Sequence, residues 1–194
     1  MLRIMKEQIR ILGVDDGPFS FKQKTVPIIG VIMRAPNYIE GICCSEITID
    51  GTDANSVLEK MINESKYKDQ IRLIMFDGIA LGGFNVIDIE RLYNSVNIPI
   101  SSITRNEPDL ALIKNTLKKH FKDWETRWQV IDNLDLERIE TNYRPIYVKC
   151  IGMGSAEVRR LINLTTVRGV LPEPIRVAHL IASAIIKGES YGRA

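Results

Sequence analysis

Two aspartates stand where apolar runs of the sequence end, and they are the residues best placed to do chemistry. Asp15 follows the run ILGV, Asp77 follows the run IMF, and a glycine follows each within two residues. Ligands gather at the carboxyl ends of the strands in sheets with parallel strands. If the two runs are neighbouring parallel strands, their ends lie about 5 Å apart, close enough for both carboxylates to hold one cation. Hard oxygen ligands of this kind favour Mg²⁺ or Mn²⁺.

The two aspartates can also have a purely structural role. Aspartate is common at strand ends, because its side chain bonds the backbone of the following turn. The pair is more informative, since two like charges placed together repel unless a cation or a substrate offsets them. Asp16 is a weaker candidate, because strand alternation turns it away from Asp15. Asp50 and Asp53 precede an expected helix, where either can supply a third carboxylate; we prefer Asp53, which can also simply cap the helix.

Three further features fit a structural role as well as a functional one. His179 lies in an expected helix with an apolar face, where a packed histidine is usual, and a metal ligand or proton donor is the alternative. The segment Gly152–Ser155 lacks the dinucleotide fingerprint and the P-loop lysine, so we interpret it as a turn and cap. The basic stretch Lys114–Lys122 is typical of a solvated helix face, with contact to a phosphate backbone as the alternative.

The composition is that of an ordinary globular chain. The sequence has 194 residues, of which 45% are hydrophobic and 26% charged, so we expect one domain spanning residues 1–194. A net charge of +2 does not by itself indicate a nucleic-acid partner. The three cysteines form no C-x-x-C pair and are expected to be reduced thiols. Because no apolar stretch has bilayer length and the first residues carry charges, we expect a cytoplasmic protein without a membrane partner.

The pattern of apolar residues predicts the elements that must position these side chains. Short apolar runs predict strands at 8–14, 25–33, 38–49, 71–76, 99–104 and 146–151. Helical spacing predicts helices at 54–65, 86–95, 109–121, 155–164 and 174–187. Three strands in hairpin order followed by alternating helices and strands predict an α/β fold of the ribonuclease H-like kind, a mixed sheet with helices on both faces. A doubly wound fold, the alternative, normally begins βαβ.

With these residues in place, nearly the whole chain resembles the endonuclease V superfamily, and most closely its small archaeal endonuclease dU branch. The motif GVDDGPF resembles the family's first strand and gives Asp15 the role of a metal ligand. The motif IMFDGIALGGFN resembles the later strand that ends in Asp-Gly and gives Asp77 the same role. The most particular match is LPEPIRVAHLIAS, residues Leu171–Ser183, which places His179 where the family carries a histidine near the metal.

The resemblance also singles out residues where this sequence departs from the family. PISSITRNEP carries Arg105 where endonuclease V usually has an active-site lysine. GESYGRA, by contrast, resembles a signature of the archaeal branch itself and brings in Glu189 and Arg193. Asp53 stands nearest to a glutamate that the family carries before its first crossover helix. The strand-separating Pro-Tyr-x-Pro-Gly wedge is not intact, and Tyr38–Gly41 offers only a partial likeness.

The resemblance implies a magnesium-dependent endonuclease that nicks DNA containing an extruded deaminated base, uracil or hypoxanthine. Inosine-containing RNA stays open as a substrate. A non-catalytic nucleic-acid-binding protein with the same fold is one alternative, favoured by Asp53 and by the incomplete wedge. A metal-dependent hydrolase of free nucleotides is another.

Overall fold

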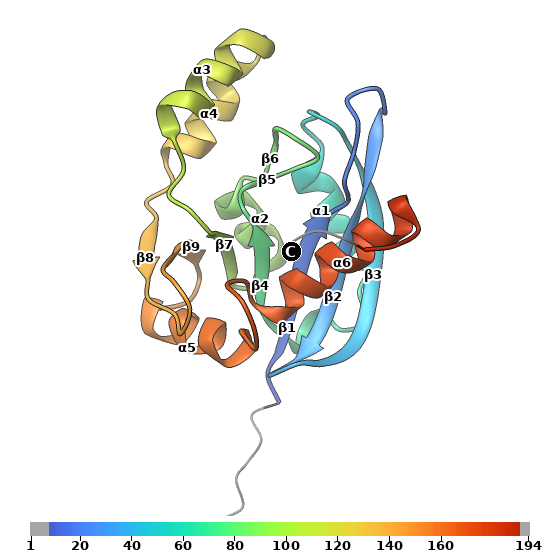
Figure 1. The fold of residues 1–194 in the computed structure, drawn as a ribbon, viewed down its shortest axis with the longest axis vertical. Helices are drawn as coiled ribbons and strands as arrows, with labels where there is room; N and C mark the ends of the chain where they lie inside the picture. The colour runs from blue at the N-terminus through green and yellow to red at the C-terminus, as the bar shows by residue number, and fades with distance from the viewer. Residues whose placement is uncertain (1–7, 191–194) are drawn as a thin grey trace, which may run out of the picture.

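A computed structural model describes residues 8–190 as one seven-stranded mixed sheet with helices on both faces (Figure 1). The order across the sheet is β3-β2-β1-β4-β7-β9-β8, and a separate hairpin is formed by β5 and β6. β1, β4 and β7 run parallel, and the remaining neighbours in the sheet are antiparallel. The strands are β1 (Arg10–Asp16), β2 (Thr25–Arg34), β3 (Tyr38–Thr48), β4 (Ile71–Asp77), β5 (Ala80–Leu81), β6 (Asn85–Val86), β7 (Ile100–Thr104), β8 (Glu137–Ile139) and β9 (Ile146–Ile151).

Residues 8–190 also form six α-helices and one 3₁₀ turn, and the α/β class predicted from the sequence is confirmed. The helices are α1 (Ala54–Asn63), α2 (Ile89–Val96), α3 (Leu110–His120), α4 (Trp124–Asp132), α5 (Ser155–Thr165) and α6 (Glu173–Lys187), and the 3₁₀ turn is Lys68–Gln70. α6 crosses one face of the sheet over β1 and β2, and α1 and α2 cover the other face (Figure 1). α3 and α4 form a hairpin of helices at the side of the molecule (Figure 1).

The structure differs from the predicted elements where segments are very short or carry a buried charge. α2 begins at Ile89 instead of residue 86, because Asn85 and Val86 pair in the β5–β6 hairpin and the side chain of Asp88 accepts the N–H of Arg91 as a cap. β5, β6 and β8 have two or three residues each, too few for a repeating pattern. α4 was not predicted, because a charged residue, Arg127, stands on its buried side.

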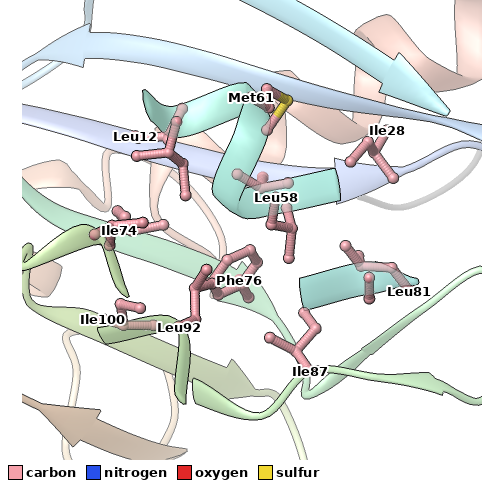
Figure 2. Close-up of a cluster of buried hydrophobic side chains, with 14 of the residues drawn as sticks. Leu12, Ile28, Leu58, Met61, Ile74, Phe76, Leu81, Ile87, Leu92 and Ile100 are labelled. Atoms are coloured by element: carbon pink, nitrogen blue, oxygen red, sulfur yellow. The ribbon is translucent and has the colours of Figure 1, made fainter. Parts of the chain in front are cut away.

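The sheet separates two apolar layers. On one face, Leu12 and Val14 of β1 and Phe76 of β4 pack against α1 and α2; Figure 2 shows this cluster around Phe76. On the other face, Ile11 of β1 and Met75 of β4 pack against α5 and α6. Successive residues of a strand alternate between faces, so Asp15 and Asp77 continue the layer of Ile11 and Met75. The alternation places both aspartates beneath α6.

The backbone of β1 touches the start of α6 directly. A Cβ atom at Gly13 would lie 2.2 Å from the carbonyl carbon of Pro174 and 2.5 Å from the nitrogen of Ile175. From Gly13 to Asp15 the strand advances about 6.6 Å, and one helical turn from Ile175 to His179 advances about 6 Å. The close contact at Gly13 therefore sets His179 beside Asp15.

Candidate active site

Asp15 and Asp77 end neighbouring parallel strands. Val14 is paired with Phe76 in the last register pair between β1 and β4, and the two aspartates follow directly. The predicted pairing of these strands is confirmed. The side chain of Asp15 is 7% exposed and that of Asp77 is 24% exposed. Burial, together with the nearby charge of Asp15, raises the pKa of Asp77 to about 6, with Arg105 and His179 acting in the opposite direction.

Each of the two carboxylates has a basic partner. His179 Nδ1 lies 2.8 Å from Asp15 Oδ2, and the Arg105 guanidinium lies 3.2 Å from Asp77 Oδ2. The hydrogen bond to Asp15 raises the pKa of His179, and burial offsets this only in part. His179 and Arg105 are 32% and 28% exposed, so both reach solvent while Asp15 does not. The site is thus an acidic pair, with Asp15 buried and Asp77 partly exposed, edged by two accessible basic groups.

Asp16 lies on the opposite face of the strand end, as strand alternation predicts. Its Oδ2 accepts the backbone N–H of Gly82 at 2.5 Å. Burial, and then the charge of Asp15, raise the pKa of Asp16 to about 6. The Asp16 side chain therefore ties the end of β1 to the β5–β6 hairpin.

Asp53 forms a separate polar junction. It occupies the N-cap position of α1 without making a side-chain cap bond. Its carboxylate accepts the Thr48 hydroxyl at 2.7 Å and the Asn85 amide at 2.5 Å. Burial acts to raise the pKa of Asp53, but these hydrogen bonds outweigh it and lower the pKa. Within residues 8–190 its carboxylate bonds Thr48 and Asn85, and no hydrogen bond joins it to Asp15 or Asp77.

Sequence reasoning missed two buried polar residues that hold the β5–β6 hairpin against the β3–α1 junction. Asn85, fully buried, accepts the N–H of Ala54 and donates to the carbonyl of Thr48. Arg127, 7% exposed, donates to the carbonyls of Gly51, Asp50 and Phe84. Asp50, one of the predicted carboxylates, accepts the N–H of Phe84 at 2.8 Å. No sequence pattern indicated these roles, since each depends on neighbours far along the chain.

The remaining predicted residues lie apart from the acidic pair. Glu189 is exposed just beyond α6, and Arg193 lies outside the described residues. Tyr38–Gly41, compared with the wedge, begins β3 opposite Arg34, which pairs with Arg10. Arg10 is five residues, about 17 Å, before Asp15 along β1. Tyr38–Gly41 therefore lies toward the opposite end of β1 from the acidic pair.

Two features that the sequence left outside the predicted metal site have structural roles. Gly154 is the N-cap of α5, as the turn-and-cap interpretation predicts. Lys114 and Lys118 of the basic stretch lie over the rings of Trp128 and Trp124, at 4.6 and 4.8 Å from the ring centroids. The lysine stems thereby cover the α3–α4 hairpin.

An apolar cavity of about 230 Å³ lies beside Asp77. Its wall begins with Gly78 and includes residues of the hairpin, of β7 and of α3, among them Ala80, Phe84, Ser102, Leu110 and Ile113. Gly78 has φ +79°, and nothing lies within 4 Å of the Cβ position, so the chain turns from the aspartate into the cavity wall. Neither this cavity nor three larger ones, of about 330, 400 and 540 Å³, is lined by Asp15, Asp77, His179 or Arg105, and of the four only this one is lined by Gly78, which follows Asp77.

The acidic pair can contribute only part of a metal's coordination. Among residues 8–190, no three or more His, Cys, Asp and Glu side chains gather into a metal-binding cluster. Asp15 and Asp77 supply two carboxylates, and protein sites for Mg²⁺ commonly use one or two, with water and phosphate oxygens supplying the rest. The donor set therefore fits a magnesium or manganese ion that also contacts a substrate.

None of the described helices is long and apolar enough to span a membrane.

The seven-stranded mixed sheet with its helices is similar to the endonuclease V fold. The catalytic domain of human endonuclease V aligns with a TM-score of 0.59 at 14% identity, over 93% of this chain and 83% of that one. Ciona intestinalis endonuclease V, in complex with a 24mer DNA containing an inosine followed by a ribo-adenosine, aligns with a TM-score of 0.57 at 12% identity, over 90% and 84%. At these identities the likeness shows the fold alone.

The chain belongs to the endonuclease dU family, whose model matches residues 7–186. A UPF0215 protein of Methanosarcina barkeri is 46% identical over 191 residues, which cover 98% of this chain and 97% of the relative. The crystal structure of a protein of unknown function from Archaeoglobus fulgidus aligns with a TM-score of 0.84 at 35% identity, over 93% of this chain and 99% of that one.

Proposed function

We propose that this chain is a Mg²⁺- or Mn²⁺-dependent endonuclease that nicks DNA at a deaminated base, uracil or hypoxanthine. The observation that carries the proposal is the pairing of the buried Asp15 with the partly exposed Asp77 at the ends of neighbouring parallel strands. Burial, and then the charge of Asp15, raise the pKa of Asp77, and a cation bound by both carboxylates would relieve the repulsion between them. We assign the metal to these two residues and Asp53 to the β3–α1 junction.

The residues of the chain perform the remaining tasks. A bound metal ion would supply positive charge at the phosphoryl oxygens and activate water. Arg105, paired with Asp77 and partly exposed, can hold a second phosphate oxygen. His179 points Nδ1 at Asp15, which leaves Nε2 to give its proton to the leaving oxygen of the broken strand. The raised pKa of His179 keeps that proton available close to neutral pH.

The cavity beside Asp77 suits one base. Sites for drug-sized ligands occupy about 300–1,000 Å³, so a cavity of about 230 Å³ matches one ring system better than a whole nucleotide. Enzymes that act on a base in DNA extrude it from the stack into such a pocket. The DNA bound by the Ciona endonuclease V contains inosine, which supports hypoxanthine as one of the two candidate bases.

Cleavage of end-labelled oligonucleotides tests the proposal. The substrates carry uracil, hypoxanthine or no lesion, and each is incubated with Mg²⁺, Mn²⁺ or EDTA. We expect metal-dependent nicking that needs the lesion and falls at least about 100-fold in Asp77→Ala, while oligonucleotide binding is largely retained. Asp69→Ala, at an exposed aspartate in the 3₁₀ turn, is the matched control and should cleave normally.

Other outcomes favour other functions. Folded protein that binds these oligonucleotides and cleaves none of them would indicate a non-catalytic nucleic-acid-binding protein. Hydrolysis of free nucleotides without cleavage of oligonucleotides would indicate a nucleotide hydrolase. An inosine-containing RNA in the same assay decides whether RNA is also a substrate.

A further inference from the structure

One hydroxyl in the wall of the cavity beside Asp77 has no hydrogen-bond partner. Ser102 of β7 is 1% exposed, and its Oγ finds no partner within residues 8–190. The only other buried side-chain atom in this condition, in the same part of the chain, is Asn163 Oδ1. Buried polar groups in proteins are almost always hydrogen-bonded, so an exception needs a physical reason.

The neighbouring hydroxyls do not share this condition. Thr104, also in the cavity wall, donates its hydroxyl to the carbonyl of Asn106 at 3.0 Å. Ser101 donates to the carbonyl of Ile74 at 3.5 Å, and strand alternation turns it to the other face of the sheet. Ser102 is therefore the one side-chain hydroxyl of this cavity wall that is left for a ligand.

The rest of the wall determines what kind of ligand this hydroxyl meets. Most of the lining side chains are hydrocarbon, with Ile79, Phe84 and Leu110 among them. Apolar walls hold a flat ring by contact area but give no preference among rings of similar shape. A single hydroxyl among them can donate to a carbonyl oxygen of the ring and so favours a ring that carries one.

We propose that Ser102 is a specificity-determining residue whose hydroxyl donates a hydrogen bond to a carbonyl oxygen of the base that occupies this cavity. Uracil and hypoxanthine both carry such a carbonyl at the position where deamination replaces an amino group. The inference rests on the proposed function for the source of the base, which is an extruded nucleotide of DNA. A site built around a hydrogen bond rejects an occupant that lacks the partner group, because the hydroxyl is then left buried without a partner.

Equilibrium binding tests this role without any cleavage. Fluorescence anisotropy in EDTA measures the affinity for three oligonucleotides, with uracil, hypoxanthine or an abasic tetrahydrofuran at one position. We expect the wild-type protein to prefer a base over the abasic position, and Ser102→Ala to reduce this preference at least about fivefold. Ser101→Ala, the same change on the same strand, should retain the preference. The melting temperature of Ser102→Ala should equal or exceed that of the wild type, because the substitution removes an unpartnered hydroxyl.

An unchanged preference in Ser102→Ala would overturn the inference, and so would a wild-type protein that does not distinguish either base from the abasic position. Failure of the proposed function is separate, since it is read from cleavage in Mg²⁺. A protein that cleaves uracil-containing DNA while Ser102→Ala keeps full preference would keep the function and lose the inference. If the protein cleaves nothing while Ser102→Ala loses its preference for a base, the proposed function fails and the inference about Ser102 stands.

Discussion

The contact between β1 and α6 predicts that Gly13→Ala will displace His179. A Cβ at Gly13 would lie 2.2 Å from Pro174, whereas ordinary contacts begin at about 3.4 Å. The start of α6 must therefore move about 1.2 Å away from β1, because both contacting groups are backbone. An equal shift would lengthen the 2.8 Å contact between His179 and Asp15 to about 4 Å, beyond hydrogen-bond reach.

The size of this effect follows from similar substitutions in packed cores. Overpacking costs about 1–3 kcal/mol, which corresponds to a fall in melting temperature of about 2–12 °C for a chain of this size. A displacement of about 1 Å at a reacting group lowers cleavage by about 100-fold. The pKa of His179 should fall toward its ordinary value, since the hydrogen bond to Asp15 is what raises it.

Thermal melts, cleavage assays and NMR titration of the imidazole protons measure these three effects. The titration is simple to assign, because the chain has only two histidines. Gly154→Ala is the matched control, since nothing lies within 4 Å of its Cβ position and its φ is −71°. A Gly13→Ala protein with wild-type melting temperature and an unchanged His179 pKa would refute the idea that this close contact positions the histidine.

Two further predictions concern the polar groups around the site. Asn85→Ala removes the hydrogen bonds that this buried side chain makes with Ala54, Thr48 and Asp53, and it should lower the free energy of unfolding by about 2–4 kcal/mol in urea melts. Asn94→Ala, at an exposed position of α2, should change it little, and equal stabilities of the two variants would contradict the prediction. The pKa of Asp77 is raised to about 6 from 3.8, so the folded protein binds the proton more tightly than the unfolded chain, and in EDTA its stability contribution is lost as pH rises from about 4 through 6. Asp77→Asn should flatten the fall in the free energy of unfolding between pH 4 and 8, as measured by urea melts. An unchanged slope would rule out Asp77 as its cause.

The main strands and the pairing of their acidic ends could be predicted because they follow from local pattern. Apolar runs such as IMF are buried on both faces, and parallel neighbours bring their carboxyl ends to one edge, so Asp15 and Asp77 could be placed together. The face of Asp16 followed from simple alternation. The period of a strand and the order of the elements are enough for all of these features.

The rest could not be predicted, because it depends on contacts between distant segments. Asn85 and Arg127 look like surface residues in the sequence, and their burial arises only when α4, the β5–β6 hairpin and the β3–α1 junction meet. The same junction takes up the carboxylate of Asp53, which the sequence alone suggested as a metal ligand. The isolation of Ser102 is likewise invisible in the sequence, since it depends on which acceptors fail to come near.

The hydrogen bond between Asp15 and His179 joins residues 164 positions apart and has a consequence for synthesis of the chain. Both aspartates leave the ribosome well before α6, which ends 110 residues after Asp77. At about 5–20 residues per second, the acidic pair exists for about 5–20 s before the helix that covers β1 is complete. A nascent or prematurely terminated chain therefore lacks the histidine and the cover over its carboxylates. Under the proposed function, cleavage would begin only once the last helix has docked, which protects nucleic acid near the ribosome from an unfinished nuclease.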